Sequence, residues 1–299
     1  NQRPMRLIWI YRNLFEVDAG GFGQLAASLS HAVSLTVLRL QACGLRPDNL
    51  EALVQVLPSL TVLTALDVSS NKEAGGAVHQ LVSVLPLTQM RRLPMSSCRL
   101  TEDPGVGTAS QMLAALTLRP DSLDVSFPPA LVAPYLRSLD VSWCKVVGGR
   151  LPLLMDALQP SVVLELRLSS CGLTTDDLAA DVCRRGCVSS LRVLDLSYND
   201  SVGDAGWAAL FAAGGLGSLE EADLSLRPLT SAPCSAWLPS LLGALPRMPA
   251  LARLAMQRWS AGPQEEQQLR FSMKNRNIRF LSRLWRDAGR HPGSHGCCR

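Results

Sequence analysis

The sequence predicts an α/β solenoid with the shape of a horseshoe, in which short parallel strands line the concave face and helices cover the convex face. Two observations lead to this fold class. One short pattern recurs along the chain: an apolar residue, any residue, a second apolar residue, two further residues, and then Asn or Cys. Successive copies begin 27 to 30 residues apart, except for one step of 46 residues. This spacing leaves room for one strand, one turn and one helix in each unit.

The copies of this pattern are identified by two apolar residues and a final Asn or Cys. They are Ile8-Ile10-Asn13, Leu38-Leu40-Cys43, Leu66-Val68-Asn71, Leu93-Met95-Cys98, Leu139-Val141-Cys144, Leu166-Leu168-Cys171 and Leu194-Leu196-Asn199. This pattern is the signature of a leucine-rich repeat. Because successive side chains of a strand point to opposite faces, the apolar residues turn inward and the residues between them face outward. Stacked units then share one core and pair their strands in parallel.

The last position of the pattern predicts a buried polar contact. An Asn at this position is expected to bond to loop backbone that has no strand partner. Cysteine can replace it, since a buried thiol is small and a weak donor. This explains Cys43, Cys98, Cys144 and Cys171 without a disulfide or a metal. Free core thiols also favour a reducing compartment, the cytosol or the nucleus.

The segments between strands have the spacing of helices. In residues 47 to 57, Leu50, Leu53, Val54 and Leu57 fall on one helical face, and Pro47 suits a first turn. Val78, Leu81, Val82 and Leu85 form a similar face, as do Leu178 and Val182 after Thr174. We therefore expect helices on the convex side of the solenoid.

The C-terminal repeats follow the pattern less closely. Ala222-Leu224-Arg227 and Leu254-Met256-Trp259 are degraded units, as is common for repeats that cap a core. A last helix is predicted to begin at Pro263, and a closing strand is predicted near residues 278 to 281. Trp207 and Trp237 are expected on helices and in the core.

Two regions interrupt the repeats. The solenoid is predicted over residues 1–281, with an irregular insertion at about residues 101–135 and a basic, disordered tail over residues 282–299. The insertion is either a Pro-rich surface segment or a repeat that has lost its helix, since Leu123–Ser126 imitates a repeat strand. The net charge of the chain is +4, and the basic excess falls after residue 260.

The outward strand positions predict a binding surface on the concave face. The predicted partner-binding residues are Trp9, Tyr11, Arg39, Asp67, Asp140, Trp143, Arg167, Asp195, Tyr198 and Asp223. The aromatic residues are the favoured anchors, since exposed Trp and Tyr are typical of binding hot spots, although packing between repeats would also explain them. The four aspartates would form an acidic stripe for a basic protein if they were adjacent, or they are only the common sequence of a hydrated strand.

Catalytic chemistry is not expected. The sequence has no phosphate-binding loop, and its four histidines have no partner at catalytic spacing. We therefore predict no catalytic residue, no cofactor, no metal and no small-molecule substrate. His291, His295, Cys297 and Cys298 are weak metal-ligand candidates, and the Cys183–Cys187 pair is expected to contribute to packing.

The partner is expected to be a protein. No run of 18 apolar residues is present, so a membrane is not an expected partner. Nucleic acid is not expected either. The basic tail is the one feature that would favour nucleic acid or an anionic membrane.

Several stretches resemble known leucine-rich repeat proteins. They are Asp140–Gly149, Leu166–Cys171, Leu194–Asp200, Asp204–Trp207, Leu226–Pro228, Arg258–Trp259 and Gln264–Glu266. Within the ribonuclease-inhibitor-like class, they resemble the C-terminal half of the family of leucine-rich repeat-containing protein thirty-one, with Cys144 in place of its turn Asn. The resemblance covers residues 136–268 and fails over residues 101–135 and after about residue 270. It implies a non-catalytic interaction protein, and the alternative is an inhibitor that occludes the active site of an enzyme.

Overall fold

The computed structural model describes residues 6–10, 19–74, 77–98, 135–158, 162–179 and 188–282. Ten short strands form one parallel sheet in chain order. They are β1 (Leu7–Trp9), β2 (Val37–Arg39), β3 (Ala65–Asp67), β4 (Arg92–Pro94), β5 (Ser138–Asp140), β6 (Glu165–Arg167), β7 (Val193–Asp195), β8 (Glu221–Asp223), β10 (Arg253–Ala255) and β12 (Arg279–Leu281). A second sheet pairs β9 (Ala232–Pro233) with β11 (Trp259–Ser260).

The sheet register aligns the repeats position by position. Leu38 pairs with Leu66, Leu139 with Leu166, and Leu166 with Leu194. These leucines are buried and form one row of the core. The recurring apolar position therefore fixes both the strands and their register, as the pattern predicts.

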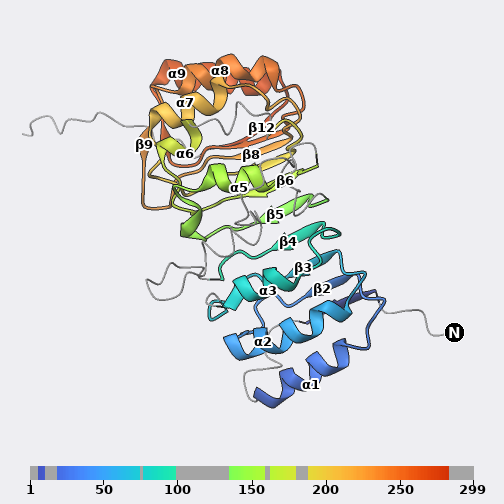
Figure 1. The fold of residues 1–299 in the computed structure, drawn as a ribbon. Coiled ribbons are helices and arrows are strands. Elements are labelled where there is room, and N and C mark those ends of the chain that lie inside the picture. Colours follow the sequence, from blue (N-terminus) through green and yellow to red (C-terminus); the bar gives the residue numbers. More distant parts are fainter. Residues whose placement is uncertain are drawn as a thin grey trace, which may run out of the picture.

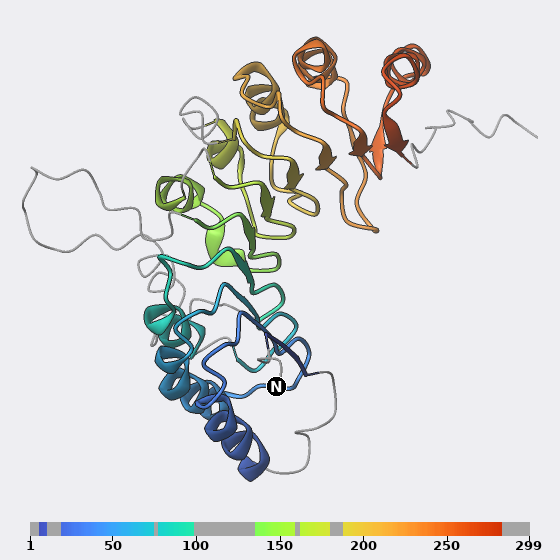
Figure 2. The same ribbon diagram turned by 90° about the vertical axis from the view of Figure 1, so that its right-hand side faces the viewer.

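Helices cover the outer side of the curve, and the sheet lines its inner side (Figures 1 and 2). The α-helices are α1 (Ala19–Leu29), α2 (Pro47–Val56), α3 (Val78–Val84), α5 (Leu151–Ala157), α6 (Thr175–Ala179), α7 (Asp204–Ala212), α8 (Leu238–Ala244) and α9 (Pro263–Asn275). Short 3-10 turns are η1 (Leu57–Ser59), η3 (Lys145–Val147) and η4 (Leu245–Arg247). This arrangement confirms the α/β leucine-rich repeat solenoid.

The helix starts follow from their sequences. Pro47 opens α2, and the backbone N–H of Arg46 donates to Oδ1 of Asn49 at 2.9 Å. Pro263 opens α9, as predicted, and the N–H of Gly262 donates to Oε2 of Glu265 at 2.8 Å. Each of these bonds satisfies an N–H at a helix start that has no partner within its helix.

The two tryptophans predicted for the core are buried. Trp207 lies on α7, and Trp237 immediately precedes α8. Both rings contact Trp259, with ring centroids 6.0 Å and 4.9 Å from the Trp259 ring. The core of the degraded C-terminal repeats therefore combines three tryptophans with the usual leucines.

The long step in the repeat spacing does not break the sheet. β4 pairs directly with β5, with Leu93 opposite Leu139, although residues 95–137 separate the two strands in sequence. No strand from this interval lies between them. Leu123–Ser126 and nearly all of the predicted insertion lie outside the described residues, as do residues 283–299 of the tail, so the division into domains stays a prediction.

Pairing is weakest between β3 and β4. These strands share one register pair, Ala65 with Arg92, whereas the other neighbouring strands of the large sheet share three. Pro94 occupies the last position of β4, and proline has no N–H for a ladder hydrogen bond. One proline thus removes one ladder hydrogen bond at this boundary, while its own carbonyl still accepts the N–H of Val68 at 3.1 Å.

The last position of the pattern forms a ladder of side chains that donate to the backbone of the preceding repeat. Nδ2 of Asn71 donates to the carbonyl of Leu40 at 2.8 Å, and Nδ2 of Asn199 donates to the carbonyl of Leu168 at 2.8 Å. In the last repeat, the indole Nε1 of Trp259 donates to the carbonyl of Leu224 at 2.7 Å. The indole thus replaces the amide in a unit that the sequence marks only as degraded.

Cysteines occupy the same ladder. Sγ of Cys43, Cys98 and Cys171 lies 3.2, 3.1 and 3.2 Å from the preceding repeat's carbonyl oxygen, and Sγ of Cys144 lies 4.0 Å from it. All four are free and buried. The predicted structural role of these thiols agrees with this geometry.

We predict that the ladder thiols resist alkylation in the folded protein. Burial raises the pKa of Cys43 from 9.0 to about 11, and raises the pKa values of Cys98 and Cys171 to about 12. Treatment with iodoacetamide at pH 8, followed by peptide mass spectrometry, should find these residues unmodified because the thiolate is the reacting species. The same residues should be modified in urea. Rapid labelling of Cys98 or Cys171 without denaturant would contradict the buried ladder.

Candidate protein-binding surface

One row of side chains runs across the concave face. Each repeat contributes one residue to this row, the residue directly after its first apolar position. Its members are Trp9, Arg39, Asp67, Pro94, Asp140, Arg167, Asp195 and Asp223, on β1 to β8. Nine of the ten predicted binding residues lie in described segments, and this row contains seven of them. Trp143 and Tyr198 follow β5 and β7. Tyr11 lies outside the described residues.

The four aspartates of this row do not form a continuous acidic stripe. Asp195 pairs with Asp223, but Arg167 lies between Asp140 and Asp195 in the register. Pro94 on β4 pairs with Asp140 on β5, and β4 lies between β5 and β3. Pro94 therefore separates Asp140 from Asp67 on β3. A row of four aspartates interrupted by Pro94 and Arg167, with Arg39 beside Asp67, suits a partner with mixed charges better than a uniformly basic one.

Each aspartate also bonds to its own strand. Oδ1 accepts the N–H of the residue two positions later, at 3.0 Å in Asp67, Asp140 and Asp195 and at 2.9 Å in Asp223. Burial raises the pKa of Asp195, with a smaller opposing effect from its hydrogen bonds to Ser197. These bonds support a structural role for the recurrent Leu-Asp-Leu-Ser sequence.

The serines of the next outward position are not part of the accessible surface. Ser69, Ser142, Ser169, Ser197 and Ser225 are all buried. The expectation that this position faces solvent is therefore wrong for the serines. Their side chains are short, and neighbouring groups cover them. Oγ of Ser197, for example, lies 2.7 Å from Oδ1 of Asp195 and 2.8 Å from Oγ of Ser169.

At the first strand, an aromatic ring is exposed. Trp9 has 59% of its surface exposed, and the guanidinium carbon of Arg39 lies 5.7 Å from the Trp9 ring centroid. This distance is within the range of a cation–π interaction. The pair gives this end of the concave row a flat, partly apolar surface.

Trp143 and Tyr198 form a second aromatic group, here called the aromatic pair. Their ring centroids are 6.2 Å apart with an interplanar angle of 59°. Trp143 follows β5 and Tyr198 follows β7. The repeat of β6 lies between them and has the small residue Ser170 at the equivalent position. Trp143 remains 50% exposed. The sequence places both residues at the edge of the concave face, but their contact depends on the stacking of the repeats.

The backbone at the aromatic pair is unusual for large side chains. Trp143 has a φ of 66° and Tyr198 a φ of 61°, in the left-handed region. Ser70, Ser97 and Ser170 occupy the same position in other repeats with φ values of 61°, 58° and 53°. The repeat imposes this conformation, which disfavours β-carbon-bearing residues other than Asn and Asp. Ala42 and Arg258 also share this position and its left-handed φ, so the conformation belongs to the repeat. Trp143 and Tyr198 are its aromatic members among the described residues.

Beside the aromatic pair lies a group that no sequence pattern marks. The guanidinium Nη2 of Arg227 donates to Oγ of Ser170 at 3.1 Å, and its Nε lies 3.9 Å from Oδ2 of Asp200. Asp200 also accepts the backbone N–H of Arg227 and the hydroxyl of Thr230. Leu229, within this loop, is fully exposed. The contact between Arg227 and Ser170 spans 57 residues of sequence, so no local pattern could predict it.

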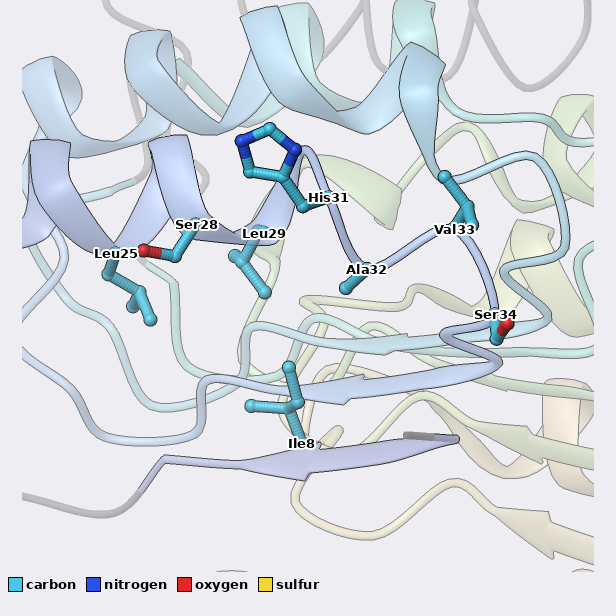
Figure 3. A pocket seen from close by; sticks show the side chains of 8 residues that line it. All are labelled: Ile8, Leu25, Ser28, Leu29, His31, Ala32, Val33 and Ser34. Carbon is cyan, nitrogen blue, oxygen red and sulfur yellow. The ribbon is translucent and has the colours of Figure 1, made fainter. Parts of the chain in front are cut away.

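A pocket of about 410 Å³ lies at the first described repeat, between β1 and α1 (Figure 3). Ile8 points from β1 towards Leu25 and Leu29 of α1, and His31 lies at the end of α1 (Figure 3). The lining is mainly apolar. It offers few groups for acid–base chemistry.

Metal-binding clusters and membrane-spanning helices are both absent from the described residues. No group of three or more His, Cys, Asp or Glu side chains within them is arranged to hold a metal ion. None of the described helices has the length and apolar character needed to cross a membrane.

Comparisons with known proteins agree with the fold. A family model described as a leucine-rich repeat matches residues 132–150 and 189–211. A ribonuclease inhibitor of Sus scrofa is 28% identical over 223 residues, which are 58% of this chain and 47% of that protein. A ribonuclease inhibitor of Mus musculus is 28% identical over 211 residues, which are 56% of this chain and 46% of that protein. The chain thus spans about half the length of the curated relatives it matches.

Among solved structures, a Bacteroides fragilis protein superposes with a TM-score of 0.50 at 14% identity. The match covers 87% of this chain and 68% of that protein. At this identity the likeness concerns the fold alone. The strand order, the repeat match and the relatives together show a leucine-rich repeat solenoid that is ribonuclease-inhibitor-like.

Proposed function

We propose that this chain is a non-catalytic scaffold that holds a protein partner on its concave face. The observation that supports this best is the row of exposed and half-exposed side chains across eight consecutive strands, from Trp9 to Asp223. Repeat proteins commonly use such extended concave surfaces for binding. A long row of mixed charges with aromatic groups suits a macromolecule better than a small substrate.

The rigidity of this surface also supports the proposal. The strands are fixed by parallel pairing, and the aspartates are held by bonds to their own backbone. Preorganised side chains lose little conformational entropy when a partner binds. Arg39, Asp67, Asp140, Arg167, Asp195 and Asp223 are the polar contacts of the proposed site, with Trp9, Tyr11 and the aromatic pair as anchors.

Two finer assignments belong to the same proposal. The stretch around Asp140–Gly149 resembles the C-terminal half of leucine-rich repeat-containing protein thirty-one, which favours an interaction protein. The free buried thiols of the ladder favour a reducing compartment, so we propose the cytosol or the nucleus as its location.

A second candidate function is inhibition of an enzyme by occlusion of its active site. The relatives named ribonuclease inhibitor favour it. The presence of Arg39 and Arg167 among the aspartates of the concave row is the observation against a uniformly basic target. Association with nucleic acid or a membrane through the basic tail rests on residues outside the described part of the chain.

The test compares partners of the wild-type chain with those of a concave-face variant in cells. The variant carries Arg39→Ala, Asp67→Asn, Arg167→Ala and Asp195→Asn, and the Asn replacements retain an oxygen acceptor for the bonds to Ser69 and Ser197. Proximity labelling should lose a defined set of proteins with the variant. Substitution of Phe271 by Ser, which removes a 65% exposed ring from α9, serves as the control. An unchanged set of partners in the concave-face variant would reject the proposed site.

The inhibitor alternative has a direct assay. A basic ribonuclease is titrated with the wild-type chain, and its rate of RNA cleavage is followed. A fall in that rate to zero at equal concentrations would favour the inhibitor function. An unaffected rate at high excess of the chain would exclude inhibition of that enzyme.

A further inference from the structure

We propose a specific docking site at the edge of the concave face for a partner segment that combines a large apolar side chain with a carboxylate. The site comprises the aromatic pair, Ser170 and Arg227, with Leu229 on the adjoining loop. It refines the proposed function by assigning the chemistry of one partner segment. The concave row can bind a protein without this site, so the two proposals fail separately.

The aromatic pair supplies the apolar part of the site. Trp143 is half exposed although its ring contacts Tyr198, so a face of the pair remains open to solvent. Serine fills the equivalent positions of the neighbouring repeats with the same left-handed backbone. Folding therefore does not require an aromatic ring here, and exposed Trp and Tyr rings are the side chains most enriched at binding hot spots.

Arg227 supplies the charged part. Its side chain is 43% exposed, and it reaches back from the repeat of β8 to Ser170, which lies between the two aromatic residues in the order of the repeats. The guanidinium has five N–H donors, and the described contacts are one bond to Ser170 and a 3.9 Å approach to Asp200. Donors remain for the bidentate contact that arginine makes with a carboxylate.

Charged residues of both signs follow the strands on this edge. Lys145, Arg227 and Arg258 follow β5, β8 and β10. Asp200 follows β7, and Asp176 and Asp204 lie at the starts of α6 and α7. Asp200 is already engaged by Arg227 and Thr230. The carboxylates of Asp195 and Asp223 lie nearer the middle of the sheet and accept bonds from Ser197 and Ser225. A partner carboxylate would thus bind to the remaining N–H donors of Arg227.

The adjoining loop extends the apolar surface. Asp200 fixes both ends of the turn from Arg227 to Thr230, while Leu229 between them is fully exposed. The next residues form β9, at one edge of the molecule (Figure 1). Leu229 thus adds one exposed apolar side chain two residues from Arg227. A partner segment seated on the site would cover it.

The test selects a random dodecapeptide phage library on the full chain and measures the affinity of the enriched synthetic peptides by fluorescence anisotropy. We expect peptides with Leu, Phe or Trp next to Asp or Glu. The double variant Trp143→Ser, Tyr198→Ser should weaken their binding at least about tenfold, as expected for a hot spot. Arg227→Gln should weaken it roughly tenfold, and Lys in place of the peptide acid should do the same.

The controls distinguish binding at this site from binding elsewhere on the chain and from loss of the fold. Serine already occupies the position of Trp143 and Tyr198 in three other repeats, so the double variant should fold, which its urea unfolding curve verifies. Phe271→Ser should leave peptide affinity unchanged. Enrichment of basic peptides, peptides that bind the double variant as well as wild type, or no enrichment would overturn this inference. Peptides that lose affinity only in the concave-face variant would overturn it while supporting the proposed function.

Discussion

Replacement of Gly148 by Ala should destabilise the solenoid by roughly 3 kcal/mol, the upper end of the usual cost of overpacking. A β-carbon at Gly148 would lie 2.1 Å from the carbonyl oxygen of Gly172 and 2.7 Å from its carbonyl carbon. Both atoms are backbone of the next repeat, so no side-chain rotation can relieve the contact. The N–H of Gly148 also donates to the carbonyl of Cys171 at 3.1 Å, and a shift of the chain would lengthen this bond.

Urea unfolding followed by tryptophan fluorescence measures this effect, because Trp207, Trp237 and Trp259 are buried. The matched control is the same substitution at Gly243, in α8, where a β-carbon would meet nothing within 4 Å. Alanine there should raise stability by up to about 1 kcal/mol through its helix propensity. Equal unfolding midpoints for Gly148→Ala and Gly243→Ala would contradict this prediction. They would show that the backbone at Gly172 moves away from the added β-carbon at little cost in stability.

The second large effect is expected from Asn199→Leu, at roughly 4 kcal/mol, because a buried polar group without a partner costs about 1–3 kcal/mol. Oδ1 of Asn199 accepts the N–H groups of Cys171 and Leu173, and Nδ2 donates to the carbonyls of Leu168 and Leu196. Leucine has similar size and can satisfy none of these groups. The amide thus contacts the backbone of the preceding repeat at Leu168, Cys171 and Leu173, and that of its own repeat at Leu196 and Ser197.

Asn199→Cys is the informative comparison. A thiol at this position can donate to the carbonyl of the preceding repeat, as Cys171 does, but it cannot replace the strong acceptor. We expect about half the loss seen with leucine, since roughly half of the bonds disappear. Chemical unfolding of both variants gives the two values. A cysteine variant less stable than the leucine variant would contradict the ladder as described.

The repeat pattern was sufficient to predict the strands, because burial of alternate side chains leaves a clear periodic signal. It also predicted the start of α9 at Pro263 and the burial of Trp207 and Trp237. The role of Trp259 was harder to predict. Its indole N–H can replace the side-chain amide of Asn only because the ring reaches the carbonyl of Leu224 in the preceding repeat.

The candidate site was less predictable. The pattern placed Trp143 and Tyr198 at the edge of the sheet, but the contact between them depends on the register of three repeats. The serines were expected to face solvent, and their short side chains are covered instead. Leu229 carries no periodic signal, and Arg227 is marked only as the last position of a degraded unit. An isolated leucine after Pro228 in an otherwise polar loop was the available clue.

The ladder bond missing between β3 and β4 has a consequence for how the molecule opens. In a stack of repeats, each unit is held by its neighbours, so we expect cooperative unfolding to stop first where a bond between neighbours is missing. Register pairing between these two strands is limited to Ala65 with Arg92, and this interruption divides the described sheet into a block of three strands and a block of seven. Trp9 and Arg39 belong to the smaller block, while the aromatic pair and Arg227 belong to the larger. A partner that contacts both would act as a clamp across this boundary and join two cooperative units into one.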